Sequence, residues 1–132
     1  MVKKRVLIVD DVFLMRNLIK SILHEAGYEI CGEAGDVIEG VEKYKQLRPD
    51  LVTWDIIMPE KEEFDGFEGI KEILSFDPQA KIIVVSALRE RRAIQKVLSY
   101  GVKEYVIKPF TKKELLSSVK KVLEEESGEE NN

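Results

Sequence analysis

Cysteine is nearly absent from this sequence, since Cys31 is the only one among 132 residues. A single thiol cannot form a disulfide within the chain, which excludes a disulfide-stapled fold and favours a cytoplasmic location. Long apolar runs are also missing, and no segment approaches the length of a membrane-spanning helix. The apolar run near the N-terminus stops at Asp10 and Asp11, which argues against a signal peptide. We therefore expect no membrane insertion.

The sequence also has no excess of positive charge. Its 21 lysines and arginines are outnumbered by 25 aspartates and glutamates, giving a net charge of −4. Phosphate backbones attract basic surfaces, so direct nucleic-acid binding is not expected. A hydrophobic fraction of 44% with 35% charged residues is typical of a globular chain with one core. We expect one domain at 1–126, an acidic disordered tail at 127–132, and no effector domain.

Short β-branched apolar runs alternate with helical patterns along the chain. The runs predict five buried strands, at residues 6–9, 28–31, 51–54, 82–85 and 105–107. Helices are expected between and after them, with boundaries marked by Gly27, Asp36 with Glu39, Gly101, and Thr111 with Glu114. The apolar spacing of the first helix includes Leu18 in its buried face, and that of the fourth includes Leu98. Strict alternation predicts an α/β fold, a doubly wound five-stranded parallel sheet with helices on both faces.

Polar residues gather where the predicted strands end. Asp10 and Asp11 follow the first strand, Asp55 the third, Ser86 the fourth and Lys108 the fifth. Ligands of open parallel sheets bind beyond these carboxyl ends, so the side chains are expected at one edge. Taken singly, each has a structural explanation, as a helix cap, a turn residue or a solvated lysine. Their joint occurrence favours a site.

The residue types in this set suit phosphoryl transfer. Three clustered carboxylates repel one another and are expected to recruit a hard cation, for which Mg²⁺ is the natural choice. The cation offsets the negative charge of an incoming phosphoryl group, which Lys108 and Ser86 contact at its oxygens. Asp55 is then the expected nucleophile, forming an acyl phosphate.

The motifs closely resemble those of the response regulator receiver family of two-component signalling, in its single-domain, CheY-like form. They are VLIVDD at residues 6–11, D-x-x-M-P at 55–59, Ser86-Ala87, and YVIKPF at 105–110. The resemblance implies the flavodoxin-like strand order 2-1-3-4-5. It also implies a protein that accepts a phosphoryl group from a sensor histidine kinase on Asp55 and changes its binding to a downstream effector protein. Such a protein is a stoichiometric phosphoacceptor, not an enzyme; we expect a monomer, with a weak dimer on phosphorylation left open.

The resemblance also assigns roles to individual residues. Asp11, Asp55 and the main-chain carbonyl of Ile57 are expected to bind Mg²⁺ directly, with Asp10 acting through water. Ser86 and Tyr105 are expected to form the switch pair, in which the ring follows the hydroxyl inward on phosphorylation. The Lys108-Pro109 bond is expected to be cis. At the rim, Ile57 and Leu88 cannot orient a water, which predicts a long-lived phosphorylated form.

Two surface features extend these expectations. Phe13 and Leu14 lie off the buried face of the first helix and Phe110 follows Pro109, so the three are expected to form an exposed kinase-docking surface. Residues 60–64 intervene before Asp65-Gly66, where the resembled family has a shorter loop. We interpret this charged insertion as a solvated loop, with a partner-specific contact as the alternative.

Other functions fit less well. A haloacid-dehalogenase-type phosphatase needs a second carboxylate two residues after its nucleophile, and residue 57 is isoleucine. A nucleotide-binding module needs a glycine-rich loop after the first strand, where this sequence has two aspartates. A purely structural role, as in degenerate receivers, is opposed by the complete acidic set. The kinase, the stimulus and the output are not specified by the sequence.

Overall fold

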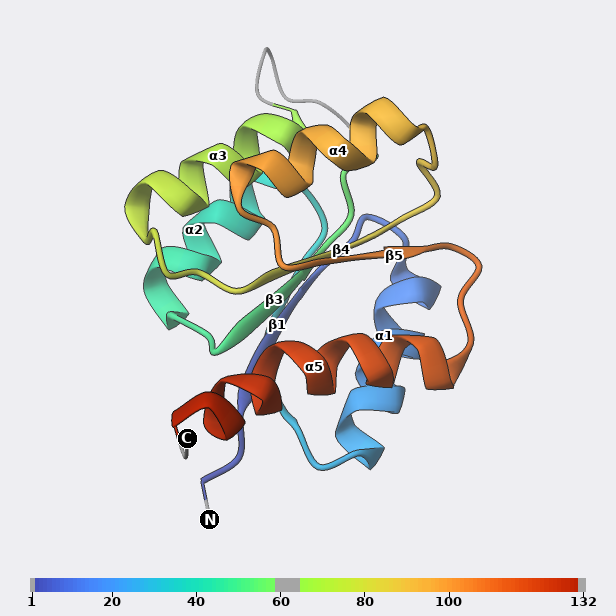
Figure 1. Cartoon of the computed structure of the whole chain (residues 1–132). Coiled ribbons are helices and arrows are strands. Elements are labelled where there is room, and N and C mark those ends of the chain that lie inside the picture. Colours follow the sequence, from blue (N-terminus) through green and yellow to red (C-terminus); the bar gives the residue numbers. More distant parts are fainter. Residues whose placement is uncertain (1, 59–64, 131–132) are drawn as a thin grey trace.

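The computed structural model describes residues 2–58 and 65–130, and for 125–130 it describes the main chain alone. The strands are β1 (Arg5–Val9), β2 (Glu29–Ala34), β3 (Leu51–Trp54), β4 (Ile82–Ser86) and β5 (Glu104–Ile107). The helices are α1 (Phe13–Glu25), α2 (Val37–Leu47), α3 (Gly66–Phe76), α4 (Arg91–Tyr100) and α5 (Lys112–Glu130). The strands form one parallel sheet in the order β2-β1-β3-β4-β5, which confirms the predicted fold (Figure 1).

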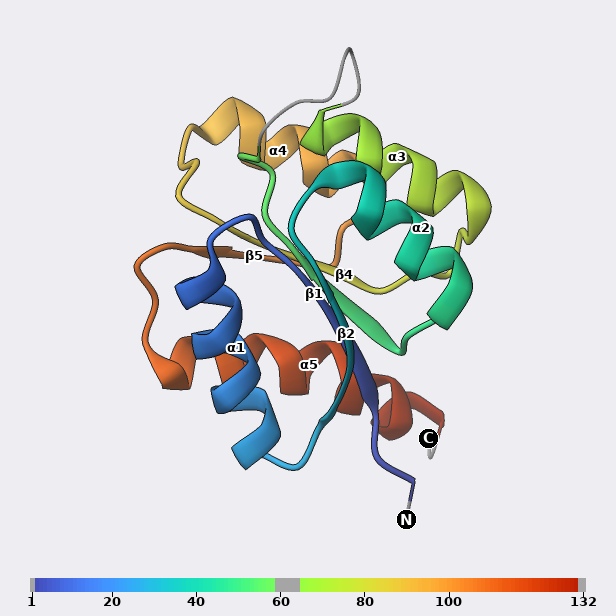
Figure 2. The ribbon, with the colours of Figure 1, turned by 180° about the vertical axis from the view of Figure 1, so that it is seen from behind.

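The sheet is covered on both faces, with α1 and α5 on one side and α2, α3 and α4 on the other (Figures 1 and 2). Successive strand residues point to opposite faces, so each strand contributes to two cores. Val6 and Ile8 pack in the cluster beneath α1 and α5, whereas Leu7 and Val9 pack in the cluster beneath α2, α3 and α4. This double coverage explains why the central strands are apolar throughout.

The helix ends follow the sequence signals. Glu39 N–H donates to Asp36 Oδ1 at 2.8 Å, and Glu114 N–H donates to Thr111 Oγ1 at 3.0 Å. Both contacts supply acceptors for main-chain donors that have no partner within the helix. Gly27 and Gly101 have φ of +98° and +116°, the left-handed conformation that ends α1 and α4 at low cost.

Three details differ from the expectations. Leu18 is 46% exposed and Leu98 is 44% exposed, so both predictions of burial were wrong. Buried residues of α1 are Ile19, Ile22 and Leu23, and α4 buries only Val97, because each helix is covered along a narrow stripe. Strand β2 runs further than predicted, to Ala34, and its register with β1 shifts between Val6 and Leu7. Helix α5 extends to Glu130; the domain boundary at 126 and the disordered tail at 127–132 stay predictions.

Among the described residues, no helix combines the length and apolar character needed to cross a bilayer.

Candidate functional site

The polar residues predicted at the strand ends meet at one edge of the sheet. Asp10 lies directly after β1 and Asp55 directly after β3, and both are almost completely buried, at 1% and 4% exposure. Ser86 ends β4 and is fully buried, while Lys108 follows β5 and is half-buried. Asp11 is exposed at the rim. The structure therefore brings together four strand ends that are far apart in the sequence.

Lys108 is the central cation of this group. Its Nζ donates to Asp10 Oδ2 at 2.6 Å and to Asp55 Oδ2 at 3.0 Å. Burial alone would lower the pKa of Lys108, but the contacts with the two carboxylates outweigh burial and raise its pKa. The ammonium therefore stays charged and ties β1, β3 and β5 together at the site. The Lys108-Pro109 peptide bond is cis, as predicted.

Opposing influences act on the pKa of Asp55. Burial raises the pKa of its carboxyl group, Lys108 opposes that rise and the nearby Asp10 carboxylate adds to it. The main-chain N–H of Ile57 donates to Asp55 Oδ1 at 3.0 Å, which favours the ionised form. The net result is a raised pKa, so this carboxylate gains from any additional positive charge placed beside it.

The acidic residues fit a hard cation. Asp10, Asp11 and Asp55 each offer a carboxylate oxygen, and these oxygens lie within 4.8 Å of one another. An all-oxygen donor set with two buried carboxylates and an exposed third is suited to Mg²⁺, which keeps part of its water shell. The residues present therefore fit the ion that the sequence predicts.

The predicted switch residues are both bound to the main chain of one residue, Leu88. Ser86 Oγ accepts a hydrogen bond from Leu88 N–H at 3.3 Å, and the hydroxyl of Tyr105 donates to the carbonyl of Leu88. The Tyr105 ring is half-buried and packs against the core beneath α2, α3 and α4. Burial raises the pKa of Tyr105, which keeps its hydroxyl protonated and able to donate. Sequence reasoning named both side chains but not the Leu88 main chain between them.

The predicted docking residues differ in exposure. Phe13 is 61% exposed and Leu14 is 76% exposed at the start of α1, whereas Phe110 is half-buried and packs against the core beneath α1 and α5. The side chain of Ile57 is 53% exposed at the rim. The charged insertion at 60–64 lies outside the described residues, so neither interpretation of it is tested.

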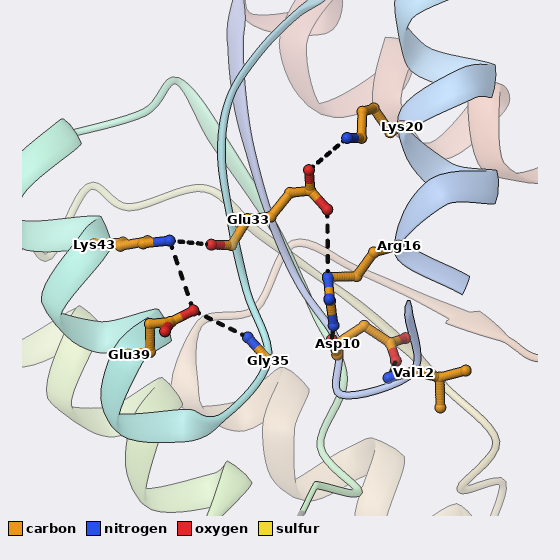
Figure 3. A network of polar contacts seen from close by, with 8 residues as sticks. All are labelled: Asp10, Val12, Arg16, Lys20, Glu33, Gly35, Glu39 and Lys43. Atoms are coloured by element: carbon orange, nitrogen blue, oxygen red, sulfur yellow. Dashed lines mark hydrogen bonds and ion pairs between the residues drawn. The ribbon is translucent and has the colours of Figure 1, made fainter. Parts of the chain in front are cut away.

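Sequence reasoning missed one residue at the site, Arg16. Its Nη1 donates to the main-chain carbonyl of Asp10 at 2.6 Å, and its Nε lies 3.3 Å from Glu33 Oε1 (Figure 3). A cation one turn after the acidic pair was the available signal. The partner Glu33 could not be identified, because its place beside α1 depends on how β2 pairs with β1.

Comparison with known proteins gives a consistent result. The family model of the response regulator receiver domain matches residues 6–120. The chemotaxis protein CheY of Thermotoga maritima is 47% identical over 119 residues, which are 90% of this chain and 97% of that protein. Protein CcdB of Bacillus subtilis is 44% identical, and CheY of the same organism 43%, each over 90% of this chain and 97% of the relative.

Solved structures show the same similarity. The crystal structure of the CheX-CheY-BeF3-Mg complex from Borrelia burgdorferi contains a chain with TM-score 0.85 and 34% identity, covering 90% of this chain and 88% of that one. A CheY-like receiver domain from Methanospirillum hungatei has TM-score 0.87 and 30% identity, covering 97% and 99%.

Proposed function

The chain belongs to the response regulator receiver family, and we propose from this membership that it takes a phosphoryl group from a sensor histidine kinase onto Asp55. The observation that carries the proposal is the double contact of Lys108 with Asp10 and Asp55, which joins three strand ends around one buried carboxylate. In the reaction, an Asp55 oxygen forms a bond to phosphorus while the phosphorus–nitrogen bond of the donor phosphohistidine breaks. The electron pair of that bond stays with the departing imidazole, which takes up a proton.

Each residue of the site has a part in this reaction. Lys108, already charged and half-buried, pairs with a phosphoryl oxygen, and Ser86 donates a hydrogen bond to another. Asp11, Asp55 and the main-chain carbonyl of Ile57 would hold Mg²⁺ directly, with Asp10 acting through a water molecule. When bound, Mg²⁺ supplies positive charge that offsets the charge on the phosphoryl oxygens. No separate substrate is turned over, so the protein acts as a stoichiometric phosphoacceptor in the cytoplasm.

The output follows from the contacts of Leu88. A phosphoryl group that draws Ser86 Oγ toward itself weakens the hydrogen bond from Leu88 N–H. The Leu88 carbonyl accepts from the Tyr105 hydroxyl, so a shift of the Leu88 main chain moves the ring as well. The result is a changed surface around β4, α4 and β5, which alters binding to a downstream effector protein.

The kinase is proposed to dock beside the acidic edge. Phe13 and Leu14 present apolar surface to solvent at the start of α1, within three residues of Asp11. Phe110, after the cis proline, lines the same rim but contributes less surface because it is half-buried. Exposed apolar side chains beside a reactive group are typical of a protein interface.

Substitution of Asp55 tests the proposal directly. We expect Asp55→Asn to abolish phosphorylation by acetyl phosphate with Mg²⁺, measured as the mass increase of one phosphoryl group. Asp65→Asn is the matched control, because Asn caps a helix as well as Asp does and Asp65 caps α3 through Glu68 N–H. Stoichiometric phosphorylation of Asp55→Asn would show that another residue is the acceptor.

A further inference from the structure

Arg16 binds the main chain at the acidic pair, Asp10 and Asp11, through the Asp10 carbonyl. Its guanidinium, on the second turn of α1, reaches back to the Asp10 carbonyl at 2.6 Å and to the Glu33 carboxylate at 3.3 Å (Figure 3). The Arg16 side chain is 18% exposed and that of Glu33 is 29% exposed, so both contacts are partly shielded from water. A planar guanidinium can serve two acceptors at once in fixed directions, which an ammonium cannot.

The segment that Arg16 holds has little other support. Helix α1 begins without a side-chain cap, because its N-cap residue is Val12. The turn into it rests on Asp10, whose N–H donates to Ala34 O at 3.0 Å and whose Oδ1 accepts from Val12 N–H at 2.8 Å. None of the described residues bonds to the Asp11 carboxylate, so its direction follows from the main chain on either side.

Glu33, the second partner of Arg16, is itself anchored from both neighbouring helices. Lys20 of α1 lies 2.5 Å from Glu33 Oε2, and Lys43 of α2 donates to the Glu33 main-chain carbonyl. Lys43 also lies 3.6 Å from Glu39 Oε1, which accepts from Gly35 N–H (Figure 3). The Arg16 guanidinium is therefore fixed by a polar network that spans α1, β2 and α2. We call this network the frame; its side chains are those of Arg16, Lys20, Glu33, Glu39 and Lys43.

We propose that Arg16 is a positioning residue for the cation site. It touches neither the phosphoryl group nor the metal, and it acts by fixing residues 10–12 so that the carboxylates of Asp10 and Asp11 point toward Asp55. The inference rests on the proposed function, since it concerns the Mg²⁺ that the phosphorylation requires. Replacing a residue that orients the ligands of a metal typically weakens metal binding by about ten- to a hundredfold.

The charge of Arg16 and its positioning role predict opposite changes in Mg²⁺ affinity when the residue is replaced. The positive charge of the Arg16 guanidinium repels Mg²⁺, so this charge alone opposes Mg²⁺ binding. If charge dominates, Arg16→Gln binds Mg²⁺ more tightly than the wild type does. If positioning dominates, the same variant binds Mg²⁺ more weakly. The sign of the change therefore separates the two roles.

The experiment is titration calorimetry of the full chain with Mg²⁺ alone. We expect Arg16→Gln to weaken Mg²⁺ binding by about tenfold and Arg16→Lys to weaken it in the same direction. Lys112→Gln is the matched control, because it takes one positive charge from an exposed ion pair with Glu25 while both contacts of Arg16, and those of Glu33, keep their partners. We expect its affinity to stay within about twofold of wild type, since an exposed charge is screened. Thermal unfolding without Mg²⁺ checks that each variant is folded.

A second readout separates positioning from a general loss of structure. In phosphorylation by acetyl phosphate, Arg16→Gln should need more Mg²⁺ for half-maximal rate but should approach the wild-type rate at saturating Mg²⁺. Equal or tighter Mg²⁺ binding by Arg16→Gln overturns the inference. If Arg16→Gln does not fold, unchanged affinity in Arg16→Lys overturns it instead. Failure of the wild type to bind Mg²⁺ contradicts the proposed function, which is a different result.

Discussion

At the scale of single residues, we expect the lifetime of the proposed phosphorylated state to depend on Ile57 and Leu88 at the rim of the site. The Ile57 side chain is 53% exposed and adjoins Asp55 through its N–H contact, while Leu88 is half-buried and packs partly against the core. Neither side chain can hydrogen-bond a water placed in line behind phosphorus. We therefore expect slow loss of phosphate, with Ile57 the more important shield because it is the more exposed.

Polar replacements at these two residues should shorten that lifetime. We expect an Ile57→Asn, Leu88→Glu double mutant to lose phosphate at least about tenfold faster than wild type, because both new side chains can orient water. The measurement is the decay of phosphoprotein after removal of the donor, with Mg²⁺ present. Ile38→Asn on α2 is a control for an exposed apolar residue away from the site. A double mutant that decays at the wild-type rate contradicts this explanation.

Thr53, two residues before Asp55, places an unsatisfied polar group in the core. Its hydroxyl is buried and, among the described residues, has no hydrogen-bond partner. On either side in the sheet it pairs with Ile8 and Ile83, both fully buried. An unsatisfied buried hydroxyl destabilises the native state, so Thr53→Val should raise the free energy of unfolding by about 1 kcal/mol. Urea unfolding measures this change, and Thr53→Ser, which keeps the hydroxyl and loses a methyl group, should lower stability. A Val variant less stable than wild type would indicate a partner for the hydroxyl.

At the scale of elements, α1 combines a buried face with an unusual exposed one. Phe13 and Leu14 are exposed and apolar at its start, and Arg16 lies 5.7 Å from the centroid of the Phe13 ring. The ring therefore lies in contact range of the side chain that holds Asp10. A partner bound at this end of α1 would adjoin both Asp55, the proposed phosphoacceptor, and the contacts of Arg16 with Asp10 and Glu33.

Charged residues at the start of α1 should disrupt kinase docking but not the chemistry. We expect Phe13→Glu with Leu14→Glu to slow phosphotransfer about tenfold, equal to about 1.4 kcal/mol, from the histidine kinase that phosphorylates wild type fastest. Phosphorylation by acetyl phosphate should be little changed, because that donor needs no docking surface. Ile38→Glu on α2 controls for an exposed apolar residue replaced by Glu. An unchanged rate of transfer from the kinase would place the docking surface elsewhere.

Local signals predicted the elements more reliably than their environments. The caps of α2 and α5 were predicted because Asp36 and Thr111 act within three residues of their partners. The exposure of Leu18 and Leu98 was not, because apolar spacing shows which face of a helix is buried but not how wide the covering neighbours are. The end of β2 was missed for a related reason, since a register shift is a property of two strands.

At the scale of the whole molecule, parallel topology explains why the site was predictable. Residues at carboxyl strand ends converge once the strands are parallel, so Asp10, Asp55 and Lys108 could be placed together before any coordinates. Contacts made through main-chain atoms were not predictable in this way. The main-chain N–H and carbonyl of Leu88 and the carbonyl of Asp10 acquire their partners only when the loops are built, and almost any residue type offers the same main-chain groups.

Glu33, at the centre of the frame, should make the stability of the whole molecule depend on pH. The hydrogen bond from Lys20 lowers the pKa of Glu33, burial opposes this, and Arg16 adds to the lowering. A folded pKa below the unfolded one gives stability that is fully present above the unfolded value, ordinarily about 4.3 for glutamate, and is lost as pH falls through the folded value. Wild type should therefore be more stable than Glu33→Gln at neutral pH, and the two should converge in acid. Urea unfolding across this pH range measures the difference, with Glu25→Gln, an exposed partner of Lys112, as the control for charge. A constant difference between wild type and Glu33→Gln from neutral pH to strong acid would show that Glu33 stabilises the fold by contacts that do not require its charge.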